Sequence, residues 1–112
     1  ESYDWVLIDD DEYIRYSWMF YAEKANKALK TFQDISSFFN EQSLINKDCV
    51  IYLDLNLGND NSIKYIPKIT DLGFSKIYLA TGDASSFKAP PNGVAGVIGK
   101  LPPNIKNSTF LS

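Results

Sequence analysis

The chain of 112 residues contains no histidine and a single cysteine, and each deficit excludes a class of chemistry. Without histidine there is no imidazole metal site, no histidine-based catalytic triad and no phosphohistidine donor within the chain itself. Cys49 cannot form an internal disulfide, and its apolar neighbours indicate a small buried hydrophobic residue in a reducing compartment. A nucleophilic role for this thiol would need a base beside it.

Basic clusters and long apolar runs are also missing. The formal net charge is −3, and the lysines and arginine are too dispersed to attract nucleic acid or an anionic membrane. No apolar run approaches membrane-spanning length, and the first residues lack a signal-peptide pattern. We expect a cytoplasmic domain with no direct contact to nucleic acid or membrane, although a parent protein would be able to tether it to one. Because the chain begins with Glu1, we expect a segment of a longer protein or a processed product.

What the chain does contain is a regular alternation of short apolar runs and helical periods. Its length and its apolar fraction of 45% suffice for a core, and we predict a single domain over residues 1–112. The apolar runs predict five strands, at residues 4–8, 28–32, 49–53, 76–80 and 94–98. Strands that alternate with helices predict right-handed crossovers and a mainly parallel, doubly wound α/β sheet with helices on both faces. The uninterrupted apolar composition of 49–53 indicates a strand that is covered on both sides.

The helices are predicted from periodicity and capping residues. The first spans residues 13–27, the second begins after a cap at Asp34, and the third follows turn and capping residues at 59–62 and runs to about residue 72. Pro67 should kink the third helix or limit its first turn. A proline pair at 90–91 leaves room for at most one irregular turn in place of a fourth helix, and only residues 104–112 remain for a fifth.

Polar residues follow the ends of four predicted strands. They are Asp9 and Asp10 after the first strand, Asp54 after the third, Thr81 after the fourth and Lys100 after the fifth. Each alone is ordinary, since aspartate and threonine are common in turns and a lone lysine is usually solvated. Together, at the edge of a parallel sheet where ligands bind, they indicate a site.

The chemistry that suits these groups is phosphoryl transfer to a carboxylate. Crowded carboxylates repel one another, and magnesium prefers carboxylate and carbonyl oxygens. We expect Mg2+ (or Mn2+) to be bound directly by Asp10 and Asp54, through water by Asp9, and by the main-chain carbonyl of Asn56. Asp54 is the predicted nucleophile and phosphoacceptor.

The remaining phosphoryl oxygens need donors. Lys100 would pair with one of them, and the Thr81 hydroxyl and the Gly82 amide would donate hydrogen bonds to the others. In this scheme the protein supplies positioning and electrostatics rather than proton transfer.

Four segments, VLIDDDEYIR, YLDLNLG, YLATGD and VIGKLPP, resemble the receiver domain of two-component response regulators and hybrid histidine kinases. The resemblance covers essentially the whole chain. The family's acidic pair corresponds to Asp9 and Asp10, its phosphoacceptor to Asp54, its hydroxyl residue to Thr81 and its lysine to Lys100. The resemblance implies a five-stranded flavodoxin-like fold, a phosphorelay in which a histidine kinase or histidine phosphotransfer protein donates the phosphoryl group, and slow autodephosphorylation.

Other positions are interpreted through the same resemblance. Asn56 and Asp83 correspond to positions that tune dephosphorylation in the family. Leu101 stands where the family usually has the proline of a cis Lys-Pro bond, and Val97 stands where an aromatic residue is frequent. With the shortened fourth helix, these departures predict a reduced output surface and favour a receiver within a hybrid sensor histidine kinase.

Alternatives remain open at this point. The chain is also compatible with a stand-alone response regulator, or with a degenerate receiver that acts as a phosphorylation-independent scaffold. A haloacid-dehalogenase-like phosphatase also uses an aspartate after a strand, but it needs a second acid two residues later, where this chain has Asn56. Whether the domain counts as an enzyme in its own right is left open.

The aromatic residues are predicted to be mainly structural. Trp5, Trp18 and the Phe38–Phe39 pair are assigned to packing. Exposed aromatic side chains of the first helix would be able to dock a partner, as they do in the family, with Tyr13, Tyr16 and Trp18 as candidates.

Overall fold

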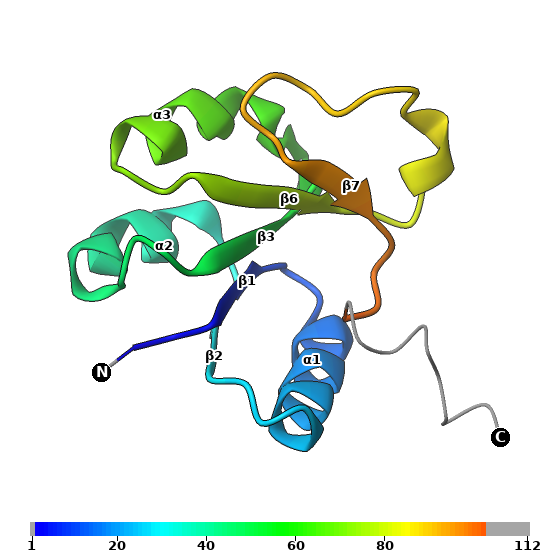
Figure 1. The fold of residues 1–112 in the computed structure, drawn as a ribbon. Helices are drawn as coiled ribbons and strands as arrows, with labels where there is room; N and C mark the ends of the chain where they lie inside the picture. Colours follow the sequence, from blue (N-terminus) through cyan, green and yellow to red (C-terminus); the bar gives the residue numbers. More distant parts are fainter. Residues whose placement is uncertain (1, 103–112) are drawn as a thin grey trace, which may run out of the picture.

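The computed structural model describes residues 2–102, which form a five-stranded parallel sheet with helices on both faces (Figure 1). The strand order is β2-β1-β3-β6-β7. The strands are β1 (Trp5–Ile8), β2 (Leu29–Phe32), β3 (Val50–Asp54), β6 (Lys76–Ala80) and β7 (Gly96–Ile98). The α/β class is therefore confirmed, and no strand end differs from the prediction by more than two residues. Residues 104–112, proposed for a fifth helix, lie outside the described residues.

The first two helices begin at aspartate caps. Helix α1 (Glu12–Lys24) follows Asp11, whose side chain accepts a hydrogen bond from the Tyr13 amide. It ends three residues before the predicted end at residue 27, and Asn26 then adopts a left-handed conformation with φ of 59°. Helix α2 (Ile35–Glu41) follows Asp34, whose carboxylate accepts from the Ser37 amide at 2.7 Å, as predicted. A 3-10 turn, η1 (Gln42–Leu44), continues from α2.

The turn and cap predicted at residues 59–62 are present, with Asn61 as the cap, but the segment that follows is not one continuous α-helix. The chain after β3 first forms an antiparallel hairpin of two short strands, β4 (Asn56–Leu57) and β5 (Asp60–Asn61), in which Gly58 adopts a φ of 63°. A 3-10 turn, η2 (Ser62–Tyr65), then leads into α3 (Ile66–Asp71). Pro67 lies in the first turn of α3, where its missing N–H breaks no helical hydrogen bond, so the proline limits the helix to its C-terminal half.

The fourth helix is reduced as predicted. Between β6 and β7 the described chain contains one 3-10 turn, η3 (Ala84–Ser86), ahead of the proline pair. No peptide bond among residues 2–102 is cis, so the bond between Lys100 and Leu101 is trans.

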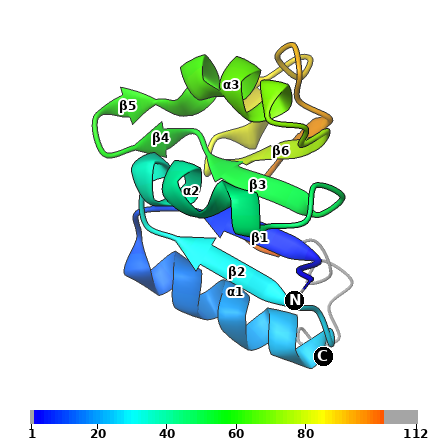
Figure 2. The same cartoon turned by 90° about the vertical axis from the view of Figure 1, so that its left-hand side faces the viewer.

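Alternating strand side chains form a core on each face of the sheet. Figures 1 and 2 show α2 and α3 on one face and α1 on the other. The α2–α3 face buries residues such as Ile51, Leu53 and Phe38, whereas the α1 face buries Trp5 and Tyr52. Strand β3 has four consecutive buried residues, which confirms that it is covered on both sides. Each large apolar side chain buried in these layers contributes about 1.5–3 kcal/mol.

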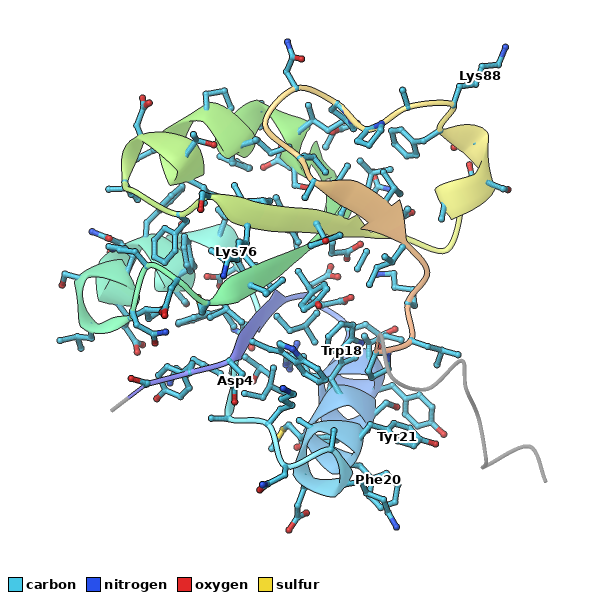
Figure 3. All side chains as sticks on the ribbon, in the orientation of Figure 1. Asp4, Trp18, Phe20, Tyr21, Lys76 and Lys88 are labelled. Carbon is cyan, nitrogen blue, oxygen red and sulfur yellow. The ribbon has the colours of Figure 1, made fainter. Side chains whose placement is uncertain are left out.

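The aromatic predictions are mostly confirmed. Trp18 is fully buried against Trp5 and Tyr52, so its candidacy as a docking residue is wrong, while Tyr13 and Tyr16 are 81% and 60% exposed. In Figure 3, Trp18 points from α1 toward the sheet and Phe20 points away from it. Cys49 is buried, and burial raises the pKa of its thiol to about 11. Among residues 2–102, no helix combines the length and apolar character needed to span a bilayer.

Candidate functional site

The carboxyl ends of neighbouring parallel strands bring three aspartates together. Asp9 and Asp10 directly follow β1, Asp54 ends β3, and the two strands pair in register, with Ile8 opposite Leu53. One carboxylate oxygen from each aspartate lies within 4.8 Å of the others, and we call this group the acidic cluster. Asp9 is fully buried and Asp54 is 5% exposed, whereas Asp10 faces solvent. The acidic cluster can hold a metal ion.

The Lys100 ammonium lies between the two buried members of the acidic cluster. Its Nζ donates to Asp9 Oδ2 at 2.8 Å and to Asp54 Oδ1 at 2.7 Å, across 91 and 46 residues of sequence. Hydrogen bonds between ionised groups are shorter and stronger than neutral ones, which fits these distances. One ammonium cannot balance three carboxylates, so the cluster retains negative charge that favours a further cation.

Burial sets the protonation behaviour of this site. Desolvation raises the pKa of Asp54 to about 6, the hydrogen bond from Lys100 opposes the rise, and the charge of Asp9 adds to it. For Lys100 burial alone would lower the pKa, but the hydrogen bonds to Asp54 and Asp9 outweigh it and the pKa is raised. At neutral pH Asp54 is therefore ionised and Lys100 is charged.

Free carboxylate oxygens remain for a ligand. Asp9 Oδ1 accepts from the Asp11 amide at 2.9 Å, and Asp10 Oδ2 accepts from the Gly58 amide at 3.0 Å. Asp54 Oδ1 accepts from both Lys100 and the Asn56 amide. Asp10 Oδ1 and Asp54 Oδ2 accept no hydrogen bond from residues 2–102, and no buried side-chain oxygen there lacks a partner, so Asp54 Oδ2 is open to solvent. Hard cations such as Mg2+ prefer such oxygens.

Thr81 lies at the same edge, but no hydrogen bond joins its side chain to the acidic cluster within residues 2–102. Its predecessor Ala80 pairs with Asp54 in the sheet, and its own amide donates to the Ile98 carbonyl at 2.9 Å. The Thr81 Oγ1 accepts from the Asp83 amide at 3.2 Å, which leaves its hydroxyl proton available for another acceptor. Asn56 reaches the cluster through its amide, and the ligand role of its carbonyl stays a prediction.

Three residues that support the site were missed from sequence. Arg15 Nη1 donates to the Asp9 carbonyl at 2.8 Å, Trp18 Nε1 donates to the Lys100 carbonyl at 2.9 Å, and the buried Ser62 hydroxyl donates to the Asp54 carbonyl. The main-chain carbonyls of Asp9, Lys100 and Asp54 are thus each held by a side-chain donor. The only sequence signal was the one-turn spacing of residues 15 and 18 on the same helix.

Comparisons with known proteins add nothing to this geometry: no family model matches the chain, and neither the curated proteins nor the solved structures give a match. The parallel α/β fold and the acidic cluster are the two features of the molecule that bear on its function.

Proposed function

We propose that the chain is a receiver domain of a two-component phosphorelay, which accepts a phosphoryl group on Asp54 from a phosphohistidine of a histidine kinase or histidine phosphotransfer protein. The observation that carries the proposal is the Lys100 ammonium, 2.7 Å from Asp54 and 2.8 Å from Asp9, beside a carboxylate cluster that can hold a metal ion. A carboxylate that would act as nucleophile, a cluster that can hold a cation and an ammonium that would bind the phosphoryl group therefore lie together.

The expected reaction is a direct phosphoryl transfer. A carboxylate oxygen of Asp54 attacks phosphorus, the bond from phosphorus to the donor's imidazole nitrogen breaks, and its electron pair stays on that nitrogen. The acyl phosphate that forms on Asp54 is then hydrolysed slowly by water. Lys100 pairs with one phosphoryl oxygen and the Thr81 hydroxyl donates to another.

Asp10 and Asp54 would hold the metal, together with the Asn56 carbonyl and, through water, Asp9. The donor set fits, because Asp10 Oδ1 and Asp54 Oδ2 accept no hydrogen bond from residues 2–102. When bound, Mg2+ (or Mn2+) neutralises negative charge on the transferring phosphoryl oxygens.

The fold supports the finer family assignment. Without the β4–β5 hairpin, the sheet follows the 2-1-3-4-5 order of flavodoxin-like domains, in which ligands bind at the carboxyl edge where the strand order reverses. Asp9 and Asp10 follow β1 and Asp54 ends β3, and these are the two strands at that reversal.

The reduced region between β6 and β7 favours a receiver inside a hybrid sensor histidine kinase. A single 3-10 turn, η3, offers little of the surface through which a fourth helix would signal. The parent reading frame tests this part: a kinase core upstream agrees with it, and a free-standing gene with its own start codon contradicts it.

The central test is phosphorylation by a small donor. Acetyl phosphate with Mg2+ should add one phosphoryl group to the wild-type protein, detected by intact mass, and beryllofluoride should bind as its mimic. Asp54→Asn should abolish both responses, whereas Asp60→Asn, which alters an exposed acid paired with Lys64, should keep them. No response in the wild type would favour the scaffold alternative, and steady turnover of phosphate esters would favour a phosphatase.

A further inference from the structure

In residues 99–102, the described segment after β7, one hydrogen bond holds the main chain to the rest of the protein. The last bond to the sheet is donated by the Thr81 amide to the carbonyl of Ile98, where β7 ends. Among the described residues, the main chain of 99–102 makes a single hydrogen bond, in which the Lys100 carbonyl accepts from Trp18 Nε1 at 2.9 Å. The preceding Gly99 has open space around its Cα and does not restrict the chain sterically.

Trp18 is a rigid donor for that bond. Its side chain is fully buried, and its ring lies 5.9 Å from Trp5 in a T-shaped contact and 4.8 Å from Tyr52 in a tilted one. The indole N–H is the only polar group of this side chain and can only donate. Trp18 lies in the middle of α1, and Figure 3 shows its side chain directed from the helix toward the sheet. The ring cannot shift without repacking the layer between α1 and the sheet.

We propose that Trp18 is a positioning residue for Lys100, which fixes the lysine main chain so that its ammonium reaches Asp9 and Asp54 together. A free lysine side chain loses rotamer entropy when it is ordered, and a mobile backbone would add to that loss. The carbonyl anchor removes the backbone contribution. One turn earlier on α1, Arg15 holds the Asp9 carbonyl, so the same helix fixes both ends of the Lys100–Asp9 pair.

The effect on phosphoryl transfer depends on the proposed function, whereas the effect on the lysine does not. Both are tested with Trp18→Phe, which removes the N–H donor and keeps an aromatic ring. Trp5→Phe is the matched control, because Trp5 belongs to the same buried cluster but makes no hydrogen bond with Lys100 in the described part of the chain. If Trp18→Phe does not fold, the same test is made with 3-benzothienylalanine at position 18, which keeps the shape of the indole without its N–H.

The first readout is the rate of Asp54 phosphorylation by acetyl phosphate at saturating Mg2+. Misplacement of a catalytic group by about 1 Å can cost on the order of 100-fold, so we expect Trp18→Phe to be roughly 10- to 100-fold slower than Trp5→Phe. In a Lys100→Met background the same substitution should cause no further loss, because the group that it positions is gone. An equal loss with and without the lysine would show a merely structural effect and overturn the proposal.

The second readout does not require phosphorylation. The Lys100 ammonium should give a resolved Nζ resonance in 15N NMR of the wild type and of Trp5→Phe, since two carboxylates hold it. That resonance should broaden or disappear in the position-18 variants. If the wild type takes no phosphoryl group but the Lys100 resonance is lost only in the position-18 variants, the proposed receiver function is wrong and the positioning role of Trp18 stands. An unchanged Lys100 resonance in the position-18 variants overturns the positioning role.

Discussion

Replacing Asp54 by asparagine should stabilise the metal-free protein at neutral pH. Burial raises the pKa of Asp54 from its ordinary value of 3.8, which applies in the unfolded chain, to about 6 in the folded protein. The folded protein therefore binds more protons than the unfolded chain between these values, so the free energy of unfolding falls as the pH rises from about 4 to about 6. A pKa difference of about 2 between the folded and unfolded states corresponds to a free energy of about 3 kcal/mol. Because the carboxylate is buried, solvent screening reduces this figure little.

Asparagine has nearly the same shape and no charge, so the variant avoids this penalty. We expect Asp54→Asn to exceed the wild type by about 1–3 kcal/mol at pH 7.5, with the lower bound allowing for the lost pairing with Lys100. Below pH 4 the wild-type carboxyl is protonated, and the difference should vanish. Urea denaturation in the presence of a chelator, followed by tryptophan fluorescence from pH 3.5 to 8, measures both values.

The difference between variant and wild type isolates Asp54 from the other acids. Asp60→Asn is a control with the opposite sign, because hydrogen bonds from Lys64 and Tyr65 lower the Asp60 pKa in the folded state. Its carboxylate stabilises the fold above the unfolded pKa, and that contribution is lost as the pH falls. A stability difference for Asp54→Asn that does not change between pH 4 and 7.5, or that is negative at pH 7.5, would refute the electrostatic reasoning.

Three further predictions concern the metal, the site support and the core. Mg2+ above its dissociation constant should raise the unfolding midpoint of the wild type with the logarithm of the Mg2+ concentration, and Asp10→Asn should lose most of this shift in thermal melts at fixed Mg2+; an equal shift in both proteins would contradict the assigned ligands. Ser62→Ala removes the buried donor to the Asp54 carbonyl and should lower the free energy of unfolding, measured with urea, by about 1–3 kcal/mol. A variant as stable as the wild type would contradict this role of Ser62. Phe38→Ala, at a fully buried ring packed on Phe32 and Phe74, should cost about 3–5 kcal/mol, and a loss below about 1 kcal/mol would mean that this layer is not close-packed.

The elements that the sequence predicted well are those specified by local signals. Strand β6 lies where its apolar run predicts, and α2 begins at its aspartate cap. The short hairpin after β3 was not predicted, because a distant residue contributes to its conformation. The Asp10 carboxylate accepts from the Gly58 amide across 48 residues and holds the β4–β5 hairpin, whereas the local pattern of turn and cap residues is equally typical of a helix start.

The convergence of the candidate site was predictable for a topological reason. Parallel strands place their carboxyl ends at one edge, so polar residues that follow apolar runs meet there whatever their separation in sequence. Asp9, Asp54 and Lys100 meet in this way. Thr81 lies at the same edge, but a strand end fixes the position of a main chain rather than the direction of a hydroxyl.

The supports of the site were not predictable, because their acceptors are main-chain carbonyls. Every residue has such a carbonyl, so no residue type at position 9, 54 or 100 indicates which side chain will bond to it. Arg15 and Trp18 occupy one face of α1, where a tryptophan is most simply explained by packing, and only the fold shows that its N–H meets the Lys100 carbonyl. A chain that kept every charged residue of the site but lost this indole would have the same sequence motif and a less ordered lysine. The motif therefore specifies the chemistry, whereas the apolar layer beneath α1 determines how well the charged groups are held in place.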